Sequence, residues 1–296
     1  MNKREENNII NAKQSIEIPK EILLPLEDVK RRINEICEHS LKNHPLYNPV
    51  MHFVNRPGKL IRPAIMLTSS LIIGVDPNSM MDLAASIEML HMSSLMHDDI
   101  IDKDTRRRNL ETVNAKYGDN TAIIAGDALI AIAVNTVSRY GSRVLDVTSR
   151  ASLDMCKGEL LDSLAQEQRK ILSLDEYLEI AEFKTGVLIA TAAQIPAVYL
   201  NDSRAGKLRD FGLNLGISFQ IRDDILNYLK MDNLKNTGND IKNFRPNIVA
   251  SYSLNESNPI KSAIDKNNEY LEKAKESLKE INNSKYLIPY LDFLNL

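Results

Sequence analysis

The chain contains no tryptophan, only two cysteines, and only 11 glycines and 11 prolines among its 296 residues. Cys37 and Cys156 have no zinc-type spacing, so we expect a reducing compartment. The scarcity of glycine and proline disfavours a sheet protein with many tight turns, and abundant Leu, Ile, Ala, Glu and Lys favour helices. The formal net charge of −3 gives no reason to expect a nucleic-acid partner.

Long apolar runs are also absent. No uninterrupted run of about 18 apolar residues occurs, and residues 1–17 have no apolar core of the kind found in secretion signals. We therefore expect no transmembrane segment and a cytoplasmic location. Residues 1–18 are polar and mixed in charge, which predicts a flexible N-terminal arm. Because neither a linker nor a repeat divides the remainder, residues 19–296 are predicted to form a single all-α domain.

Apolar residues recur at helical spacing through most of the chain. They predict helices over about 26–41, 63–74, 79–103, 121–140, 144–170, 174–200 and 203–229. Gly74 fits a helix end, and Ser173 with Glu176 fits an N-terminal capping box. Residues 230–247 are polar and show no periodicity, so they are predicted to form a loop that is functional or disordered.

Residues 90–108, LHMSSLMHDDIIDKDTRRR, combine an apolar run with three aspartates and three arginines. Positions three or four apart lie on one face of a helix, so Asp98, Asp99 and Asp102 share a face. Like charges repel unless a cation lies among them, and hard oxygen ligands suit Mg²⁺. A solvated helix end with simple Asp–Arg pairs is the alternative. The apolar residues before Asp98 favour the metal site, because they predict a mostly buried helix.

A second acidic cluster, Asp223, Asp224 and Asn227 in FQIRDDILN, repeats this spacing about 125 residues later. Alone it is a weak signal. Two such clusters are more informative, because inward-facing side chains on opposed helices of a bundle commonly build metal sites.

Basic residues recur where a phosphate site would need them. GKLIRP contains Lys59 and Arg62, EFKTG contains Lys184 and Thr185, and the polar loop contains Lys235. Lys59 and Lys235 are surface charges by default. Lys184 lies in an apolar helix, where a lone ammonium needs an anionic partner. Carboxylates, magnesium and basic side chains around one cavity would describe a diphosphate site.

With these motifs in this order, the chain closely resembles the all-trans polyprenyl diphosphate synthases, the head-to-tail prenyltransferases of isoprenoid biosynthesis. The resemblance spans about residues 25–296 and includes GKLIRP, LHMSSLMHDDIID, AGDALI, GELLD, FKTG and FQIRDD. It implies an all-α bundle of the isoprenoid-synthase type around a deep central cavity, usually in a homodimer.

The resemblance also implies roles for individual residues. Mg²⁺, as three ions when substrate is bound, would be held by Asp98, Asp99, Asp102, Asp223 and Asp224, which with Lys184 are the predicted catalytic residues. Predicted contacts of the allylic diphosphate are Arg107, Lys184, Gln220 and Lys235, with Thr185 bordering the reaction zone. Predicted contacts of isopentenyl diphosphate are Lys59, Arg62, His91 and Arg108. Asn227 departs from the family's third aspartate, Asn109 from its usual glycine, and Arg106 is an extra cation.

The implied reaction ionises the allylic diphosphate, condenses the cation with isopentenyl diphosphate and eliminates a proton. In the family, bulky aromatics four and five positions before the first aspartate stop chain growth early. Ser94 and Ser93 stand there, with Leu90 lower, and predict a medium- or long-chain product. The alternatives are a shorter farnesyl or geranylgeranyl product, a terpene cyclase or head-to-head synthase, and a weakly active or non-catalytic subunit of a heteromeric synthase. The intact GKLIRP and arginine pair disfavour the cyclase, and the complete first aspartate motif disfavours the non-catalytic subunit.

Overall fold

The computed structural model describes residues 15–56, 58–108, 110–233 and 245–296, with the backbone alone for 230–233. Helices form nearly all the regular structure of these ranges, which confirms the all-α prediction. The chain forms two compact units, here called the N-terminal unit (Ile18–Ser149 with Ile195–Ala205) and the C-terminal unit (chiefly Arg150–Gln194 with Gly206–Leu296). That residues 19–296 are one domain stays a prediction.

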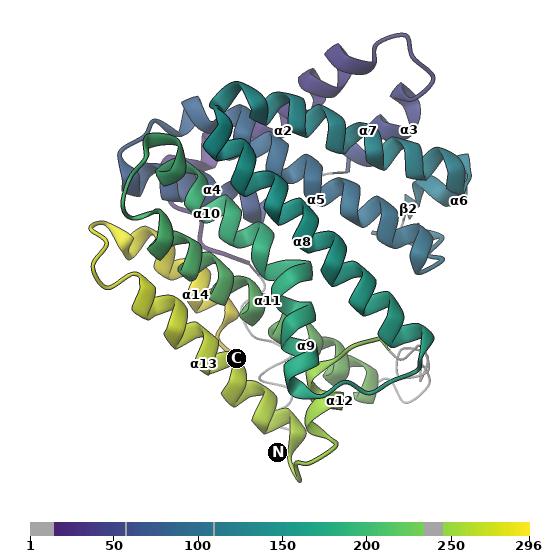
Figure 1. Cartoon of the computed structure of the whole chain (residues 1–296), viewed down its shortest axis with the longest axis vertical. Helices are drawn as coiled ribbons and strands as arrows, with labels where there is room; N and C mark the ends of the chain where they lie inside the picture. Colours follow the sequence, from purple (N-terminus) through teal and green to yellow (C-terminus); the bar gives the residue numbers. More distant parts are fainter. Residues whose placement is uncertain (1–14, 57, 109, 234–244) are drawn as a thin grey trace. The chain divides into compact units, whose positions relative to one another are not determined.

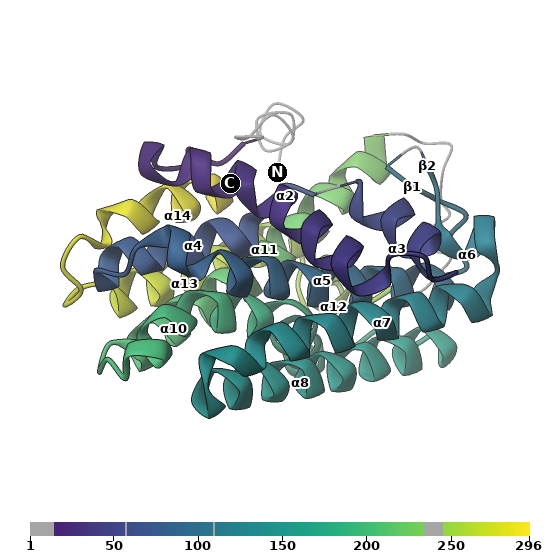
Figure 2. The ribbon, with the colours of Figure 1, turned by 90° about the horizontal axis from the view of Figure 1, so that it is seen from above.

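Helix α5 is the centre of the N-terminal unit. It packs along α7 and against α2 and α4 (Figures 1 and 2). Every residue from Leu83 to Leu90 is buried, so all sides of this stretch are covered. The elements of this unit, in chain order, are α2 (Lys20–Leu41), α3 (Tyr47–Val54), α4 (Ile61–Ile73), η1 (Pro77–Met80), α5 (Met81–Ile101), β1 (Arg106–Arg107), β2 (Leu110–Glu111), α6 (Val113–Tyr117), α7 (Asp119–Val137) and η2 (Ser138–Tyr140).

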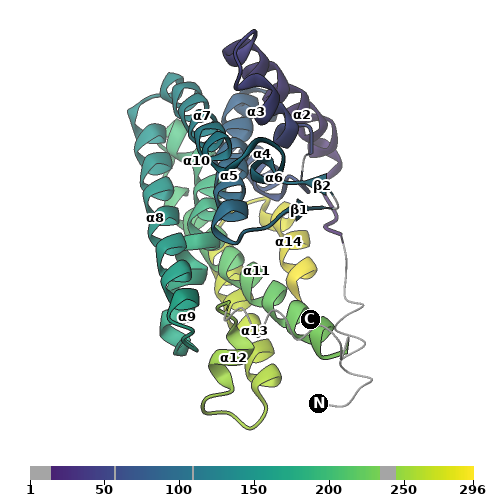
Figure 3. The ribbon, with the colours of Figure 1, turned by 90° about the vertical axis from the view of Figure 1, so that its right-hand side faces the viewer.

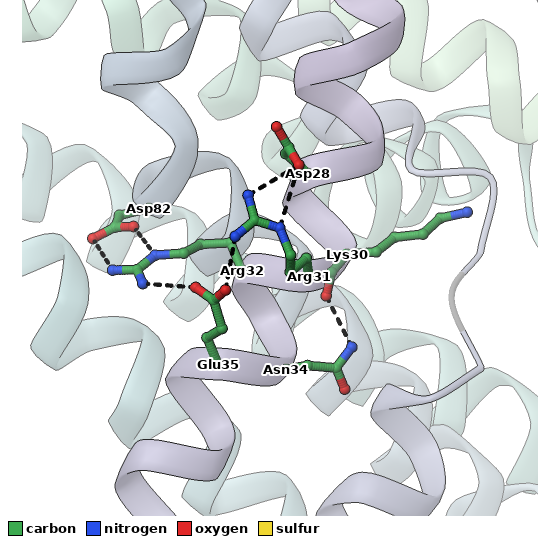
Figure 4. Close-up of polar contacts among 7 residues, drawn as sticks. All are labelled: Asp28, Lys30, Arg31, Arg32, Asn34, Glu35 and Asp82. Carbon is green, nitrogen blue, oxygen red and sulfur yellow. Dashed lines mark hydrogen bonds and ion pairs between the residues drawn. The ribbon is translucent and has the colours of Figure 1, made fainter.

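An ion pair fixes the first turn of α5 to α2. Arg32 donates from Nε to one oxygen of Asp82 at 2.5 Å and from Nη2 to the other at 3.1 Å (Figure 4). Such a two-point pair holds both orientation and distance. Glu35 accepts from Arg32 and from Arg31, which completes the network on the α2 side. The amino end of α5 is therefore anchored to α2.

The carboxyl end of α5 closes with a Schellman motif. Asp104 N donates to Asp99 O and Lys103 N donates to Ile100 O, with Lys103 in the left-handed region at φ 57°. The predicted end at about residue 103 is close to the observed end at Ile101, but the sequence contains no glycine here to indicate the Schellman motif itself. The chain then forms a two-stranded antiparallel hairpin, β1–β2, which lies beyond α5 and next to α6 (Figure 3). The hairpin falls where the sequence predicts a loop.

The C-terminal unit is built around α11 and the helices that cover it. Its core contains the apolar face of α11, chiefly Ile221, Ile225 and Leu229, packed with Tyr177 and Ile248. Ser173 and Glu176 form the predicted capping box at the start of α9. The elements are most of α8 (Ser142–Glu167), α9 (Leu174–Ala181), η3 (Glu182–Gly186), most of α10 (Val187–Leu200), α11 (Ala205–Asn233), α12 (Ile248–Tyr252), α13 (Pro259–Ser277), η4 (Ser284–Leu287) and α14 (Ile288–Leu294).

Two helical stretches of the described chain are long and apolar enough to cross a membrane by length and composition alone. One is Leu174–Leu200, and 67% of its most apolar window is buried, as in the core helix of a soluble protein. The other is Asp119–Tyr140, of which only 39% is buried. The expected absence of transmembrane segments stays a prediction.

Candidate functional site

The first acidic cluster lies at the carboxyl end of α5. Asp98 and Asp102 are partly exposed, whereas Asp99 is buried. This end of a helix is its negative pole, so three carboxylates here are repelled by the helix as well as by one another. The arrangement therefore favours a bound cation or cationic side chains.

Arg107 supplies one such cation. Its Nε lies 2.6 Å from Asp99 Oδ1, and the hairpin brings it there from eight residues along the chain. Burial raises the pKa of Asp99, and Arg107 opposes that rise. The other oxygen, Oδ2, is buried without a hydrogen-bond partner among the described residues. A buried acceptor left in this state is costly unless a ligand satisfies it.

The four predicted isopentenyl diphosphate ligands belong to the N-terminal unit. Arg62 and Arg108 are close enough to His91 to interact with it electrostatically. Burial, and then the charges of Arg62, Arg108 and Arg107, hold the pKa of His91 well below its usual range, so its imidazole is neutral. Burial lowers the pKa of Arg62, and nearby Glu88 opposes this. Lys59 is exposed and lies two residues before α4. The result is a cluster with excess positive charge, which suits a phosphate group.

In the C-terminal unit, Lys184 finds the anionic partner that its apolar helix requires. Its Nζ lies 2.7 Å from Glu159 Oε2 and 2.5 Å from Asp162 Oδ2, both on α8. Lys184 and Thr185 lie in η3, a π-helical turn, a rare form that is frequent at functional sites. Gly158 permits the approach, because a Cβ there would lie 2.6 Å from Lys184 N.

The second acidic cluster divides into exposed and buried members. Asp223 and Asn227 are exposed on α11. Asp224 is buried, and it accepts hydrogen bonds from Tyr177 Oη at 2.6 Å and Gln220 Nε2 at 2.9 Å. Burial raises the pKa of Asp224 to about 7, although these donors oppose the rise. Thr185 donates to Gln220 Oε1 at 2.8 Å, so one chain of hydrogen bonds links the two predicted substrate contacts to Asp224.

The predicted chain-length residues lie on α5 before the aspartates. Leu90 and Ser93 are buried, and Ser94 is partly buried with its hydroxyl donated to His91 O. Lys235 and Asn109 lie outside the described residues. Arg62, His91, Arg107 and Arg108 lie near one another in the N-terminal unit, and Thr185, Gln220 and Asp224 are joined by hydrogen bonds in the C-terminal unit. That both acidic clusters serve one site stays a prediction.

Sequence reasoning assigned no role to several side chains that hold the predicted residues. Glu159 and Asp162 lie in GELLD, a motif that contributes to the family resemblance but predicts no role for either residue. Glu88 precedes His91 by one helical turn. Nothing in the sequence indicates a role for Tyr177 except its position seven residues, or about two helical turns, before Lys184.

Among the described residues, no group of three or more His, Cys, Asp or Glu side chains is arranged to hold a metal ion. Magnesium does not require such a cage. It is usually bound through one or two carboxylates, with water and substrate phosphate completing the shell. The partly exposed Asp98 and Asp102 and the unsatisfied oxygen of Asp99 fit that kind of site.

The chain is similar to known proteins over most of its length. The family model described as polyprenyl synthetase matches residues 43–284. A geranylgeranyl pyrophosphate synthase from Geoglobus acetivorans is 31% identical over 310 residues, covering 91% of this chain and 97% of that protein. The geranylfarnesyl diphosphate synthase of Aeropyrum pernix is 35% identical over 221 residues, covering 69% of each chain. The crystal structure of geranylgeranyl pyrophosphate synthetase from Pyrococcus horikoshii matches with a TM-score of 0.81 at 27% identity, covering 91% of this chain and 97% of that one. The chain therefore belongs to the polyprenyl synthetase family, and it is a prenyltransferase of the all-trans polyprenyl diphosphate synthase type.

Proposed function

We propose that this enzyme joins isopentenyl diphosphate head-to-tail to an allylic prenyl diphosphate, with Mg²⁺, in the cytoplasm. The observation that carries the proposal is the carboxyl end of α5. There, three carboxylates and the Arg107 guanidinium lie beside a cationic cluster that includes Arg62 and Arg108. Carboxylates for a metal and cations for phosphate oxygens in one unit are the two requirements of a diphosphate site.

The residues proposed to hold Mg²⁺ are Asp98, Asp99, Asp102, Asp223 and Asp224. Of these, Asp98, Asp102 and Asp223 are partly or fully exposed, and Asp99 has a buried oxygen without a partner among the described residues. When bound, the metal would neutralise negative charge on the departing diphosphate. Asp224 is buried and accepts hydrogen bonds from Tyr177 and Gln220, which orient its carboxylate.

The other proposed site residues bind the two substrates and stabilise charge. Arg107, Lys184, Gln220 and Lys235 are proposed to bind the allylic diphosphate, with Thr185 beside them. Lys59, Arg62, His91 and Arg108 are proposed to bind isopentenyl diphosphate. The cations stabilise the negative charge that builds as the C–O bond breaks. The isopentenyl double bond then attacks the allylic cation, and the proton lost afterwards passes to the released diphosphate.

The product is proposed to be a medium- or long-chain polyprenyl diphosphate. Ser93 and Ser94 occupy positions where bulk would stop the hydrocarbon tail, and neither has bulk. Named relatives include farnesyl, geranylgeranyl and geranylfarnesyl diphosphate synthases, so family membership by itself leaves the length open.

The proposed function predicts that the purified protein elongates farnesyl diphosphate in the presence of isopentenyl diphosphate and Mg²⁺. Radiolabelled isopentenyl diphosphate should appear in products that thin-layer chromatography sizes after dephosphorylation. Excess EDTA should abolish incorporation, and added Mg²⁺ should restore it, because charge on the leaving group would otherwise be uncompensated. Absence of incorporation with dimethylallyl, geranyl, farnesyl and geranylgeranyl primers would defeat the proposal.

A second copy of the chain is proposed to cover the exposed apolar face of α7, giving a homodimer. Ile123 and Ile124 on this helix are 44% and 53% exposed, and Val134 is also exposed. Apolar surface of this kind is removed from water when an isologous dimer forms. Ile124→Asp is expected to shift the protein from dimer to monomer in sedimentation velocity at micromolar concentration. Leu254→Asp, which changes an exposed leucine outside α7, is the matched control. A wild-type monomer at these concentrations would contradict the homodimer.

A further inference from the structure

His52 on α3 and Arg56, two residues after the end of that helix, both contact one backbone carbonyl of the β1–β2 hairpin. Arg56 Nη1 donates to Glu111 O at 2.6 Å, and His52 Nε2 lies 3.0 Å from the same oxygen. Glu111 is in β2, and its cross-strand partner is Arg106 in β1. Two donors, one on α3 and one two residues after its end, therefore hold the strand that pairs with the beginning of the arginine run.

The imidazole of His52 is itself held in one protonation state. Arg56 Nη2 lies 3.1 Å from His52 Nδ1, and Lys116 Nζ lies 3.4 Å from it. Because both neighbours are donors, Nδ1 is the acceptor and Nε2 carries the proton that Glu111 O accepts. Burial lowers the pKa of His52, and the charges of Arg56 and Lys116 add to this effect while the hydrogen bond to Glu111 O opposes it, so the net shift favours the neutral form. The edge of the Tyr117 ring packs against the imidazole at a centroid distance of 5.5 Å.

Arg108, in the loop of the hairpin, contacts the backbone of Arg56. Arg108 Nη1 donates to Arg56 O at 3.0 Å. A Cβ placed on Gly58 would lie 2.8 Å from Arg108 Nη2, so the guanidinium also packs directly against the glycine backbone. Arg108 is the first residue of the two-residue loop between β1 and β2, and its φ of 51° is the left-handed conformation that such hairpin loops favour. The side chain of Arg56 thus holds the strand of the hairpin, and the main-chain carbonyl of the same residue accepts a hydrogen bond from the head group of Arg108.

We propose that Arg56 and His52 are positioning residues that orient the Arg108 guanidinium for isopentenyl diphosphate. This inference rests on the proposed function, in which Arg108 binds that substrate. A free arginine side chain loses considerable rotamer freedom when it binds a phosphate, and an arginine already held loses less. The pair therefore lowers the cost of binding isopentenyl diphosphate without contacting it.

The test separates substrate affinity from turnover. Arg56→Met is expected to raise the KM for isopentenyl diphosphate about tenfold, since hydrogen bonds to a charged group are lost, and to change the allylic KM and kcat less than about twofold. His52→Phe should act in the same direction. Arg56→Lys should restore affinity only in part, because one ammonium cannot reach Glu111 O and His52 Nδ1 together. Arg31→Met, an exposed arginine on α2, is the control and should behave as wild type.

A double-variant comparison distinguishes positioning from direct contact. In an Arg108→Met background, Arg56→Met should add no further loss of isopentenyl diphosphate affinity, measured both by KM and by calorimetric binding. A full additional tenfold loss would mean that Arg56 contacts the substrate itself, and the positioning role would be wrong. Gly58→Ala provides a second route, because it displaces the same guanidinium and leaves Arg56 intact; it should weaken isopentenyl diphosphate binding by a similar factor.

The two proposals fail separately. If the wild-type protein elongates primers but the Arg56 and His52 variants keep the wild-type KM for isopentenyl diphosphate, positioning is overturned and the proposed function stands. If the wild type elongates nothing, the proposed function falls. Calorimetry would then still decide positioning, because wild-type binding that Arg56→Met weakens supports it and wild-type protein that binds no isopentenyl diphosphate refutes it.

Discussion

Asp98→Ala is expected to lower kcat for chain elongation by about a thousandfold, the range found when one group that stabilises transition-state charge is removed. Asp98 is partly exposed at the negative pole of α5, one helical turn before Asp102. These two side chains lie on one face of the helix, and both are less buried than Asp99. Loss of either should leave charge on the departing diphosphate without compensation.

The measurement is a steady-state elongation assay with calorimetric titration of Mg²⁺ and inorganic pyrophosphate. Circular dichroism should show that Asp98→Ala keeps its helices, since the side chain is at a helix end. Asp210→Ala, which removes an exposed aspartate from α11, is the matched control and should retain wild-type rates. Elongation by Asp98→Ala at near-normal rates would mean that the metal is held elsewhere.

Ser94→Phe is expected to shift the product from a medium or long chain to farnesyl or geranylgeranyl diphosphate. Ser94 is partly buried, so a ring can enter the space beside it, where the tail is proposed to grow. Ser93 is buried, and a ring there should cost about 1–3 kcal/mol in the free energy of unfolding from overpacking. The two variants therefore separate an effect on product length from an effect on packing. Chromatographic sizing of dephosphorylated products and thermal unfolding measure the two effects.

Leu90→Ala supplies the opposite change. It removes bulk one turn before Ser94 on α5, and it is expected to lengthen the product or to broaden its distribution. Wild-type product lengths in both Ser94→Phe and Leu90→Ala would refute the proposed path of the tail along α5. A wild-type enzyme that already stops at geranylgeranyl diphosphate would instead show that another residue limits growth.

Much of the helical fold was predictable, because it depends on signals that neighbours in sequence provide. Periodic apolar residues indicated the long helices, Gly74 adopts the expected left-handed conformation after α4, and Ser173 and Glu176 form the expected capping box. The position of Asp98 and Asp99 at the end of a mostly buried helix was equally local. The need of Lys184 for an anionic partner followed from its apolar surroundings.

The features that escaped prediction depend on contacts between distant residues or on weak local signals. The hairpin has strands of two residues each, too short for any alternation, and its contacts with α3 join residues more than fifty positions apart. Lys103 ends α5 in a left-handed conformation that glycine normally signals. Tyr177 reaches Asp224 across 47 residues, and nothing in the sequence near either one indicates the other.

The π-helical turn at Glu182–Gly186 has a consequence for changes in chain length. A π turn holds one residue more than an α turn, so deleting one residue within it would convert the segment into a regular helix. Because the wider turn itself accommodates the extra residue, α9 and α10 would keep their relative phase, and the contact between Ala190 and Gly212 would be retained. The deletion would instead remove the wide turn that carries Lys184 and Thr185, so the length of this segment should be under stricter constraint than its composition.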